Sequence, residues 1–491
     1  MAVGPKCLLP WHGSDGGSAC AQRATTASDL ALVVVSLHGL ARRLARRRAA
    51  PQPAAPAAAL LAAAVDAVHS DSESTLFDVT ASAPKGPRHG KMRGFSSNAR
   101  QFACANLLDC LWQCVGRVKI VLMGISWLGR QTSEFADLDW ENLGFGLVQT
   151  DYMYTTKCGP DGNFDKGGMV PFGPIEMNPA SGVLNYGQGL FEGLKAYRKT
   201  DGSILLFRPM ENAMRMQTGA ERMCMPAPPV EQFVDAVKQT VLANKRWVPP
   251  TGKGSLYIRP LLVGSGAVLG LAPAPEYTFL IFASPVGNYF KEGLAPINLI
   301  VEDKFHRATP GGTGGVKTIG NYASVLMAQK IAKEKGYSDV LYLDAVEKKY
   351  LEEVSSCNIF VVKGNVISTP AIKGTILPGI TRKSIIDVAL SKGFQLTIAL
   401  CDEYAFLLKI HKSTVEERLV SVDELLDADE VFCTGTAVVV SPVGSITYQG
   451  KRIEYAGKQG VGAVSRQLYT SLTSLQMGQV EDPMGWTVQL N

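Results

Sequence analysis

The sequence lacks the cysteine and histidine patterns that build metal sites or disulfide frameworks. It contains no C-x-x-C pair and only six histidines in 491 residues, and its ten cysteines are scattered at positions 7, 20, 104, 110, 114, 158, 224, 357, 401 and 433. Structural zinc sites need closely spaced cysteine or histidine pairs, and disulfide scaffolds are typical of much shorter chains. We therefore expect no metal site, and free thiols in a reducing compartment.

The sequence also lacks long apolar runs and, over most of its length, any excess of one charge. The apolar stretches at 30–37 and 120–128 are too short to span a bilayer. The net charge is +5, and residues 1–65 hold seven Lys/Arg against two Asp/Glu, which leaves 42 basic and 42 acidic residues in the remainder. This balance gives no electrostatic reason to expect nucleic acid or a membrane surface as a partner.

The first 134 residues have the composition of a targeting or disordered extension rather than of a domain. RRLARRR (42–48) is followed by an Ala/Pro run over 49–64, with several Ser/Thr and few acidic residues nearby. Organelle transit peptides have this character, although Ala/Pro tracts also occur in plain disordered extensions. Ordered sequence is expected to begin near Phe135.

The stretch GGTGGVKTIGNYASVL (311–326) carries one lysine just after a glycine cluster. A Walker-type loop would need Gly directly before Lys, but Val316 intervenes, and Lys317 takes the place of the third glycine of a dinucleotide fingerprint. A partly desolvated lysine loses its proton readily and can form a Schiff base with an aldehyde. Lys317 is therefore a candidate Schiff-base amine, with a plain surface lysine beside a turn as the alternative.

From residue 135 onward the hydrophobic pattern predicts a mixed α/β fold. Strands are predicted at 255–263, 277–286, 297–302, 339–344, 358–362 and 365–369. Helices are predicted at 211–223, 231–245, 321–335 and 381–392. The last of these has Thr381 near its start and Gly393 after its end, and a capping box from Ser421 to Glu424 predicts another helix start. The turn-rich segment 287–296 falls between two strands and is expected to be a hinge between domains.

An aldehyde cofactor bound at Lys317 would need three supports, and the chain offers a candidate for each. A phosphate is expected at Gly379-Ile380-Thr381, where LPGITRKSI opens a helix. Glu353 is the candidate to hold a proton on a pyridine nitrogen, and Arg259, inside the apolar strand, is the candidate to bind a substrate carboxylate. Taken singly, Glu353 is more often a solvated turn residue and Arg259 a structural ion pair, but their coexistence favours a site.

Together these features resemble the branched-chain amino-acid aminotransferases, which are pyridoxal-phosphate enzymes of fold type IV, and the plant organellar members most. The resemblance covers about residues 135–491 and rests on motifs in the same order: LNYGQGLFEGLKAYR (184–198), FRPMENAMRM (207–216), SLYIRP (255–260), GGVKTIGNY (314–322), LEEVSSCNIF (351–360), TILPGITR (375–382) and CTGTAVVVSPV (433–443). It implies a smaller domain at 135–287, a linker at 288–296 and a larger, lysine-bearing domain at 297–491, with the active site at the domain interface.

The same resemblance implies a role for each site residue. Lys317 would form the imine with pyridoxal 5'-phosphate and carry the proton between substrate Cα and cofactor C4′, while Glu353 would pair with the pyridine nitrogen and Tyr322 with the phenolic oxygen. The remaining cofactor contacts, mostly to the phosphate, would come from Arg215, Leu377, Gly379, Ile380, Thr381 and Thr436. The substrate would be bound by the Thr436-Ala437 turn, Tyr257 and Arg259, and an apolar wall would be formed by Phe191, Tyr186 and Tyr257.

The implied reaction is a ping-pong exchange in which Leu, Ile or Val gives its 2-oxo acid and 2-oxoglutarate gives glutamate. Because family members are at least dimers, a homodimer is expected, and Tyr186 is allowed to come from the partner subunit. A chloroplast location is expected, with the mitochondrion as the alternative. Within the same fold, a D-amino-acid aminotransferase or aminodeoxychorismate lyase would share Lys317 and Glu353, but SLYIRP and GTAVVVSPV favour the branched-chain interpretation.

The chain departs from the family pattern at two places. Val438 and Ser441 replace the redox cysteine pair of vertebrate members, so thiol gating is not expected. LTIALCDEYAFLLKIHKST (396–414) separates GFQ from VEERLVSVDELL, where connections of a few residues are usual. We interpret this atypical insertion as a retained intron or mispredicted exon, with a genuine loop as the alternative. A catalytically impaired splice product acting only as a dimer partner is the corresponding alternative function.

Overall fold

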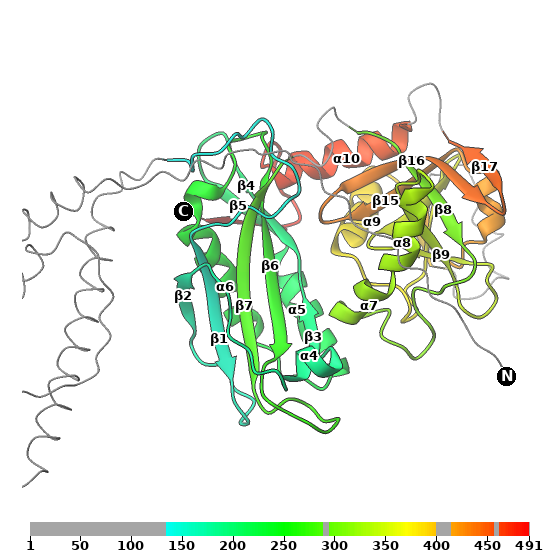
Figure 1. Ribbon diagram of the computed structural model, residues 1–491. Coiled ribbons are helices and arrows are strands. Elements are labelled where there is room, and N and C mark those ends of the chain that lie inside the picture. The colour runs from blue at the N-terminus through cyan, green and yellow to red at the C-terminus, as the bar shows by residue number, and fades with distance from the viewer. Residues whose placement is uncertain (1–133, 288–293, 399–413, 456–460, 491) are drawn as a thin grey trace, which may run out of the picture. The chain divides into compact units, whose positions relative to one another are not determined.

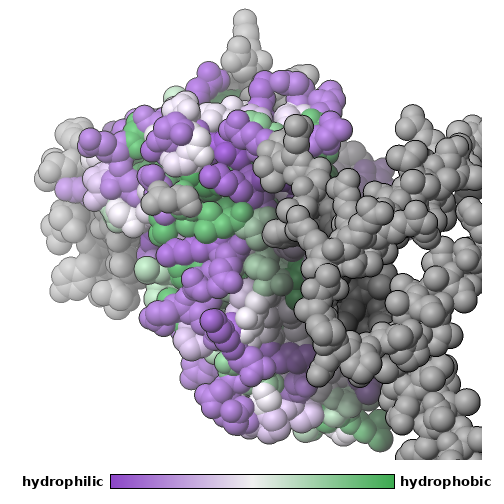
Figure 2. Space-filling model, turned by 90° about the vertical axis from the view of Figure 1, so that its left-hand side faces the viewer, coloured by the Kyte–Doolittle hydropathy of each residue, from purple (hydrophilic) through white to green (hydrophobic). Residues whose placement is uncertain are grey.

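The computed structural model describes residues 134–287, 294–398, 414–455 and 461–490. These residues form two β-sheets with helices packed against them (Figure 1). The predicted N-terminal extension lies outside the described residues, apart from Glu134. No helix in the described part of the chain is both long and apolar enough to cross a membrane. The face drawn in Figure 2 is mainly hydrophilic, with a band of hydrophobic residues across it.

The first sheet has eight strands in the order β18-β5-β4-β6-β7-β1-β2, with β3 paired to β6. Its strands are β1 (Tyr152–Cys158), β2 (Gly168–Pro171), β3 (Gly189–Phe191), β4 (Leu194–Arg198), β5 (Ile204–Phe207), β6 (Ser255–Gly264), β7 (Tyr277–Val286) and β18 (Thr487–Leu490). Its pairings are antiparallel, and β6 and β7 pair continuously from Ser255↔Val286 to Gly264↔Tyr277. Through β18, the C-terminal end of the chain returns to β5.

The second sheet has ten strands in the order β10-β9-β8-β16-β15-β11-β12-β14-β13, with β17 paired to β16. Its strands are β8 (Ile297–Glu302), β9 (Asp339–Leu343), β10 (Leu351–Val354), β11 (Asn358–Lys363), β12 (Val366–Pro370), β13 (Gln395–Ile398), β14 (Thr414–Arg418), β15 (Glu430–Gly435), β16 (Val439–Tyr448) and β17 (Lys451–Glu454). A further pairing of β10 with β11 closes the path through β9, β8, β16 and β15 into a ring.

The helices cover the sheets through apolar faces. They are α4 (Gly182–Tyr186), α5 (Pro209–Arg222), α6 (Val230–Ala243), α7 (Ile319–Ser324), α8 (Leu326–Glu334), α9 (Ile380–Ser391) and α10 (Ala463–Gln476), with short 3-10 helices at Lys245–Trp247 and Val422–Leu426. Phe233 and Val237 of α6 share a core with Leu256 and Phe279 of the first sheet. Helices α9 and α10 pack together and on β15 of the second sheet.

The predicted strands and most predicted helices are present with small differences at their ends. Helix 321–335 differs, because it is broken at Val325 into α7 and α8. The capping box of Ser421 and Glu424 opens a 3-10 helix rather than an α-helix. Glu353 lies inside β10, paired with Asn358 of β11, rather than in the turn before a strand. Most of the predicted hinge, 288–293, lies outside the described residues, so the domain division stays a prediction.

Only the ends of the predicted insertion 396–414 are described. Its first residues continue β13, its last residue begins β14, and residues 399–413 lie outside the described part. The two strands are parallel, with Gln395 opposite Thr414 and Ile398 opposite Glu417. Gln395, just before the insertion, and Val415, just after it, therefore lie on adjacent strands, one residue apart in register.

Candidate active site

The site-bearing segments of the two sheets meet through hydrogen bonds around Lys317. The Phe191 amide donates to the Lys317 carbonyl at 3.2 Å, and the Thr318 hydroxyl donates to the Gly189 carbonyl at 2.8 Å. On the other side, the Thr436 hydroxyl donates to the Gly193 carbonyl at 3.2 Å. The strands β3 and β4 are thus tied both to the lysine loop and to the turn between β15 and β16.

Lys317 projects into a cluster of aromatic and charged side chains. Its amine lies 3.0 Å from the Tyr322 hydroxyl and 4.3 Å from the centre of the Phe191 ring. Burial, reinforced by the positive charge of Arg215, lowers the pKa of Lys317 to about 7. At neutral pH a large fraction of this amine is therefore unprotonated, as a nucleophilic lysine requires.

The glycines before Lys317 allow the chain to pack closely against a neighbouring loop. Gly311 has a φ of +76°, which favours glycine. A side chain on Gly314 would collide with the carbonyl of Thr375, and the Gly315 amide donates to the Gly374 carbonyl at 2.8 Å. These glycines serve close backbone packing.

Glu353 is held in a buried network on β10. Its side chain is 2% exposed and accepts a hydrogen bond from the Leu377 amide at 2.9 Å, while the Arg307 guanidinium lies 2.7 Å from Oε1. Burial raises the pKa of Glu353 to about 7, and Arg307 acts in the opposite sense. The structure thus brings Leu377 beside Glu353 and adds Arg307, which the sequence analysis did not single out.

Arg215, on α5, is fixed by a carboxylate that was also missed. Its Nε and one terminal nitrogen donate to Glu192 at 2.8 and 2.7 Å, and its other terminal nitrogen donates to the Pro378 carbonyl at 3.0 Å. The Glu192 side chain is 1% exposed and accepts a further bond from Asn212 at 2.8 Å. This arrangement ties α5 to the loop that leads into α9.

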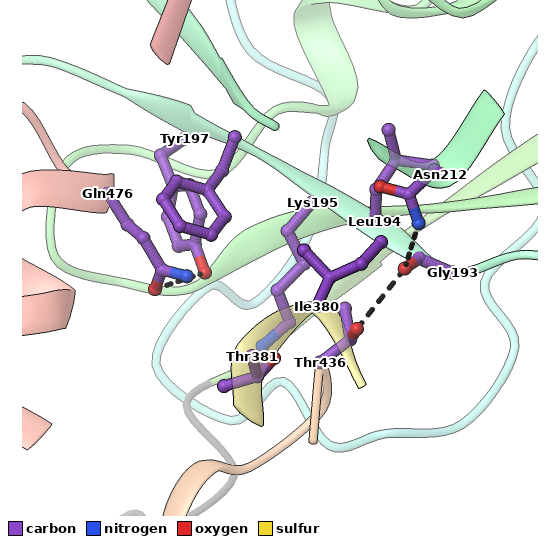
Figure 3. A pocket seen from close by; sticks show the side chains of 10 residues that line it. Gly193, Leu194, Lys195, Tyr197, Asn212, Ile380, Thr381, Thr436 and Gln476 are labelled. Carbon is purple, nitrogen blue, oxygen red and sulfur yellow. Dashed lines mark hydrogen bonds between the residues drawn. The ribbon is translucent and has the colours of Figure 1, made fainter. Parts of the chain in front are cut away.

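The N-terminus of α9 faces Arg215. Gly379 is its N-cap residue in an extended conformation and supplies no side-chain cap, so the first N–H groups of the helix have no capping side chain. Gly379, Ile380 and Arg215 line one cavity of about 400 Å³. Ile380, Thr381 and Thr436 line a second cavity of about 20 Å³ (Figure 3).

The predicted substrate wall is assembled in part. Phe191 packs edge-on against Tyr322 at 4.7 Å between ring centres, and the Arg259 guanidinium lies 4.8 Å from the centre of the Phe191 ring and 5.2 Å from that of Tyr257. Arg259 donates to the Tyr257 hydroxyl at 3.2 Å, while its buried Nε has no partner among the described residues. Tyr186 instead lies at the end of α4, 40% exposed, where its hydroxyl bonds to the Leu269 carbonyl.

A third residue that the sequence analysis missed is Lys195, on β4, whose amine donates to the Ala437 carbonyl at 2.8 Å. Charged residues within the otherwise apolar segment LFEGLKAYR were the available signal for Glu192 and Lys195, as for Arg259 in its strand. Arg307 had no such pattern around it. The described residues contain no cluster of three or more Asp, Glu, His or Cys able to hold a metal ion.

Comparisons with known proteins identify the family of the chain. The amino-transferase class IV family matches residues 189–446. The chain belongs to the class IV aminotransferases. Within this family it falls in the branched-chain group. It is 73% identical over 361 residues to the branched-chain amino acid aminotransferase 2, chloroplastic, of Humulus lupulus. The match covers 74% of this chain and 84% of that one. It is 60% identical over 362 residues to the mitochondrial enzyme 1 of the same plant, covering 74% and 87%.

Solved structures show the same fold. The Escherichia coli branched-chain amino acid aminotransferase has a TM-score of 0.57 and 28% identity, covering 70% of this chain and 100% of that one. The T.th. enzyme with pyridoxamine 5'-phosphate has a TM-score of 0.56 and 27% identity, covering 70% and 99%. The cofactor of a class IV aminotransferase is pyridoxal 5'-phosphate, and an amine of low pKa, a buried carboxylate and an uncapped helix N-terminus beside an arginine fit its aldehyde, ring nitrogen and phosphate.

Proposed function

We propose that this protein catalyses the reversible transamination of L-leucine, L-isoleucine and L-valine with 2-oxoglutarate, giving branched 2-oxo acids and glutamate. The observation that carries the proposal is the position of Lys317, whose amine has a pKa near 7 and lies among Tyr322, Phe191 and Arg215. The relatives named above, which are branched-chain aminotransferases by name, support this choice of substrates.

Pyridoxal 5'-phosphate supplies an aldehyde for the substrate amine and a ring that accepts electrons when bonds at Cα break. Its phosphate would be held by the α9 N–H groups of Ile380 and Thr381, by the Thr436 hydroxyl and by Arg215. The Glu353 carboxylate would keep the ring nitrogen protonated, with the Leu377 amide fixing its orientation. Tyr322 would donate to the phenolic oxygen.

Lys317 would move the proton from the substrate Cα to C4′ of the cofactor in one half of the cycle, and from C4′ back to Cα in the other half. Its amine can accept a proton at neutral pH because burial has lowered its pKa to about 7. The Tyr322 hydroxyl, 3.0 Å away, would orient the amine. The Phe191 ring, 4.3 Å from the amine, would keep water from this position.

The apolar wall would accept both branched and acidic side chains. Phe191 and Tyr257 present ring surface to a branched aliphatic group. Arg259 lies against both rings, and its Nε donor has no partner in the part of the chain that the structure describes. We assign that donor to the distal carboxylate of glutamate or 2-oxoglutarate. The Thr436-Ala437 turn would bind the α-carboxylate common to every substrate.

We further propose a homodimer in which Tyr186 completes the partner's pocket. Within its own chain the Tyr186 hydroxyl bonds to the Leu269 carbonyl, and the residue is 40% exposed. Its neighbour Leu269 is 91% exposed, Leu271 is 87% exposed and Leu184 is 62% exposed. Such exposed leucines are costly in water and are typical of a protein–protein contact.

The domain division at 288–296 and a chloroplast location remain part of this proposal. The chloroplastic relative is 73% identical and the mitochondrial one 60%, which supports the plastid over the mitochondrion. Imaging a fluorescent fusion of the first 134 residues tests the location. A diffuse cytosolic signal would contradict both organelles.

The reaction is tested with the purified full-length chain and a panel of amino donors. We expect visible absorbance from bound cofactor, and transfer from leucine, isoleucine and valine to 2-oxoglutarate that is abolished in Lys317→Ala. The panel includes D-alanine and methionine, because transfer from a D-amino acid alone would favour a different enzyme of the same fold. Bound cofactor without transfer from any amino acid would favour an impaired dimer partner.

A further inference from the structure

Lys195 is a buried cation without an anionic partner. It lies on β4 and is 8% exposed as a residue. Among the residues that the structure describes, its amine makes one hydrogen bond, to the Ala437 carbonyl at 2.8 Å, and forms no ion pair. Two arginines of the site are paired, by contrast: Arg215 with Glu192, and Arg307 with Glu353.

Burying an ammonium group against a neutral carbonyl alone is unfavourable, because the group loses its hydration without gaining an opposite charge. Burial lowers the pKa of Lys195 to about 8, so most of the amine is still protonated at neutral pH. A protein keeps such a charge at a cost in stability. An anionic ligand that arrives later would offset that cost.

The surroundings of Lys195 indicate where that anion binds. Lys195, Gly193 and Asn212 come from the first sheet and its helix α5, and they line the 20 Å³ cavity together with Thr381 and Thr436 from the second sheet (Figure 3). A cavity of this size holds about one water molecule. The same Thr381 and Thr436 are the residues to which the phosphate is assigned.

The charges at the phosphate end are not balanced without Lys195. A phosphate ester carries nearly two negative charges at neutral pH. Arg215 lies beside the start of α9, where it donates to the Pro378 carbonyl, but Glu192 accepts two hydrogen bonds from it and cancels its charge. The uncapped N-terminus of α9 contributes only about half a positive charge.

We propose that Lys195 is a charge-balancing residue for the cofactor phosphate, acting across the small cavity it shares with Thr381 and Thr436. This proposal rests on the proposed function and goes beyond it by assigning the buried lysine of β4 to one group of the cofactor. An opposite charge near the phosphate in a partly dry site changes affinity by about tenfold to a hundredfold. Through the Ala437 carbonyl, Lys195 also holds the neighbouring turn in place.

The test compares pyridoxal 5'-phosphate with pyridoxal, which lacks the phosphate, as ligands of the full-length apoenzyme. Dissociation constants are measured for wild type, Lys195→Met, Lys195→Arg and a matched control, Tyr197→Phe, which alters the same strand and cavity wall without changing charge. We expect Lys195→Met to raise the dissociation constant of pyridoxal 5'-phosphate about tenfold to a hundredfold, and to change that of pyridoxal by less than about threefold. Lys195→Arg and Tyr197→Phe should keep the wild-type ratio of the two constants.

Two outcomes would overturn the assignment. If Lys195→Met raises the dissociation constants of both ligands by the same factor, the lysine only maintains the fold around the turn. Unchanged affinity for both, with a raised KM for every amino acid, would mean that it serves the substrate carboxylate. Wild-type protein that binds neither ligand would instead overturn the proposed function, so the two failures are distinguishable.

Discussion

The guanidinium of Arg307 lies 2.7 Å from Glu353 Oε1, and the two side chains are 1% and 2% exposed. They come from positions 46 residues apart and meet behind the site proposed for the cofactor ring. Because burial favours the neutral carboxyl, Arg307 is the group that keeps Glu353 ionised near pH 7. An ionised Glu353 is the form that can stabilise a protonated ring nitrogen.

Replacing Arg307 by Met should therefore raise the pKa of Glu353 above 7 and lower kcat at pH 7 by about tenfold or more. The deficit should shrink as the pH is raised, because Glu353 then ionises without help. The free energy of unfolding, measured by thermal denaturation, should also fall by about 3–5 kcal/mol because the buried ion pair is broken. Arg418→Met is the matched control, since Arg418 pairs with Glu416 and Glu424 away from the site. Identical pH profiles for Arg307→Met and wild type would refute this role.

The lowered pKa of Lys317 predicts the pH dependence of its reactivity in the apoenzyme. With a pKa of about 7, the unprotonated fraction rises tenfold for each pH unit below 7 and levels off above it. The rate of cofactor incorporation should follow this curve. A solvated lysine with the usual pKa of about 10 would instead react at a rate that continues to rise beyond pH 9. A plateau only above pH 9 for Lys317 would show that its amine is not perturbed.

Arg259 should discriminate between acidic and branched substrates. Replacing it by Met keeps apolar contact with Phe191 and Tyr257 but removes the donors. We expect the KM of glutamate and of 2-oxoglutarate to rise by about tenfold to a hundredfold, because a charge-assisted bond is lost. The rate constant of the half-reaction with leucine alone should change by less than about threefold. An equal loss with leucine would place Arg259 at the α-carboxylate instead.

Deleting residues 396–414 should leave the fold and the activity intact. Gln395 and Thr414 are directly paired in parallel strands, so a direct link from Gln395 to Val415 spans little more than one strand spacing. The midpoint of thermal unfolding should change by only a few degrees, and kcat/KM for leucine should be unchanged.

A second variant tests β13 separately from residues 399–413. Replacing 399–413 by a Gly/Ser linker of equal length keeps β13, which needs a crossover of about a dozen residues to run parallel to β14. If the deletion unfolds the protein while the linker variant is stable, β13 is a required edge strand. The interpretation of the insertion as a gene-model artefact would then be wrong.

The sequence allowed the local structure to be predicted, and it singled out Lys317, whose amine is buried and has a lowered pKa. The strands at 277–286 and 297–302 agree with β7 and β8 at both ends, because turn residues flank continuous apolar runs. The helix over 321–335 was predicted as one element, since its periodicity does not reveal the break at Val325. The return of β18 to β5 had no local signal at all.

The supporting charges were harder to predict for a physical reason. Glu192 and Arg215 lie 23 residues apart, and Arg307 and Glu353 lie 46 apart, so no spacing rule joins them. A buried ion pair is a tertiary event, and either partner looks like a surface residue until the fold is known. Lys195 and Glu192 could have been noticed by the argument applied to Arg259, because each charge interrupts an apolar segment.

The residues to which we assign the phosphate come from both sheets, and this has a consequence for the lifetime of the protein. Arg215 belongs to α5 of the first sheet, whereas Ile380 and Thr381 belong to α9 of the second. A ligand gripped from both sides acts as a removable cross-link, since the halves can part only after it leaves. In cells short of cofactor, activity would then fall for two reasons: unloaded enzyme is inactive, and it is degraded faster by proteases. The amount of this protein would therefore rise and fall with the supply of its cofactor.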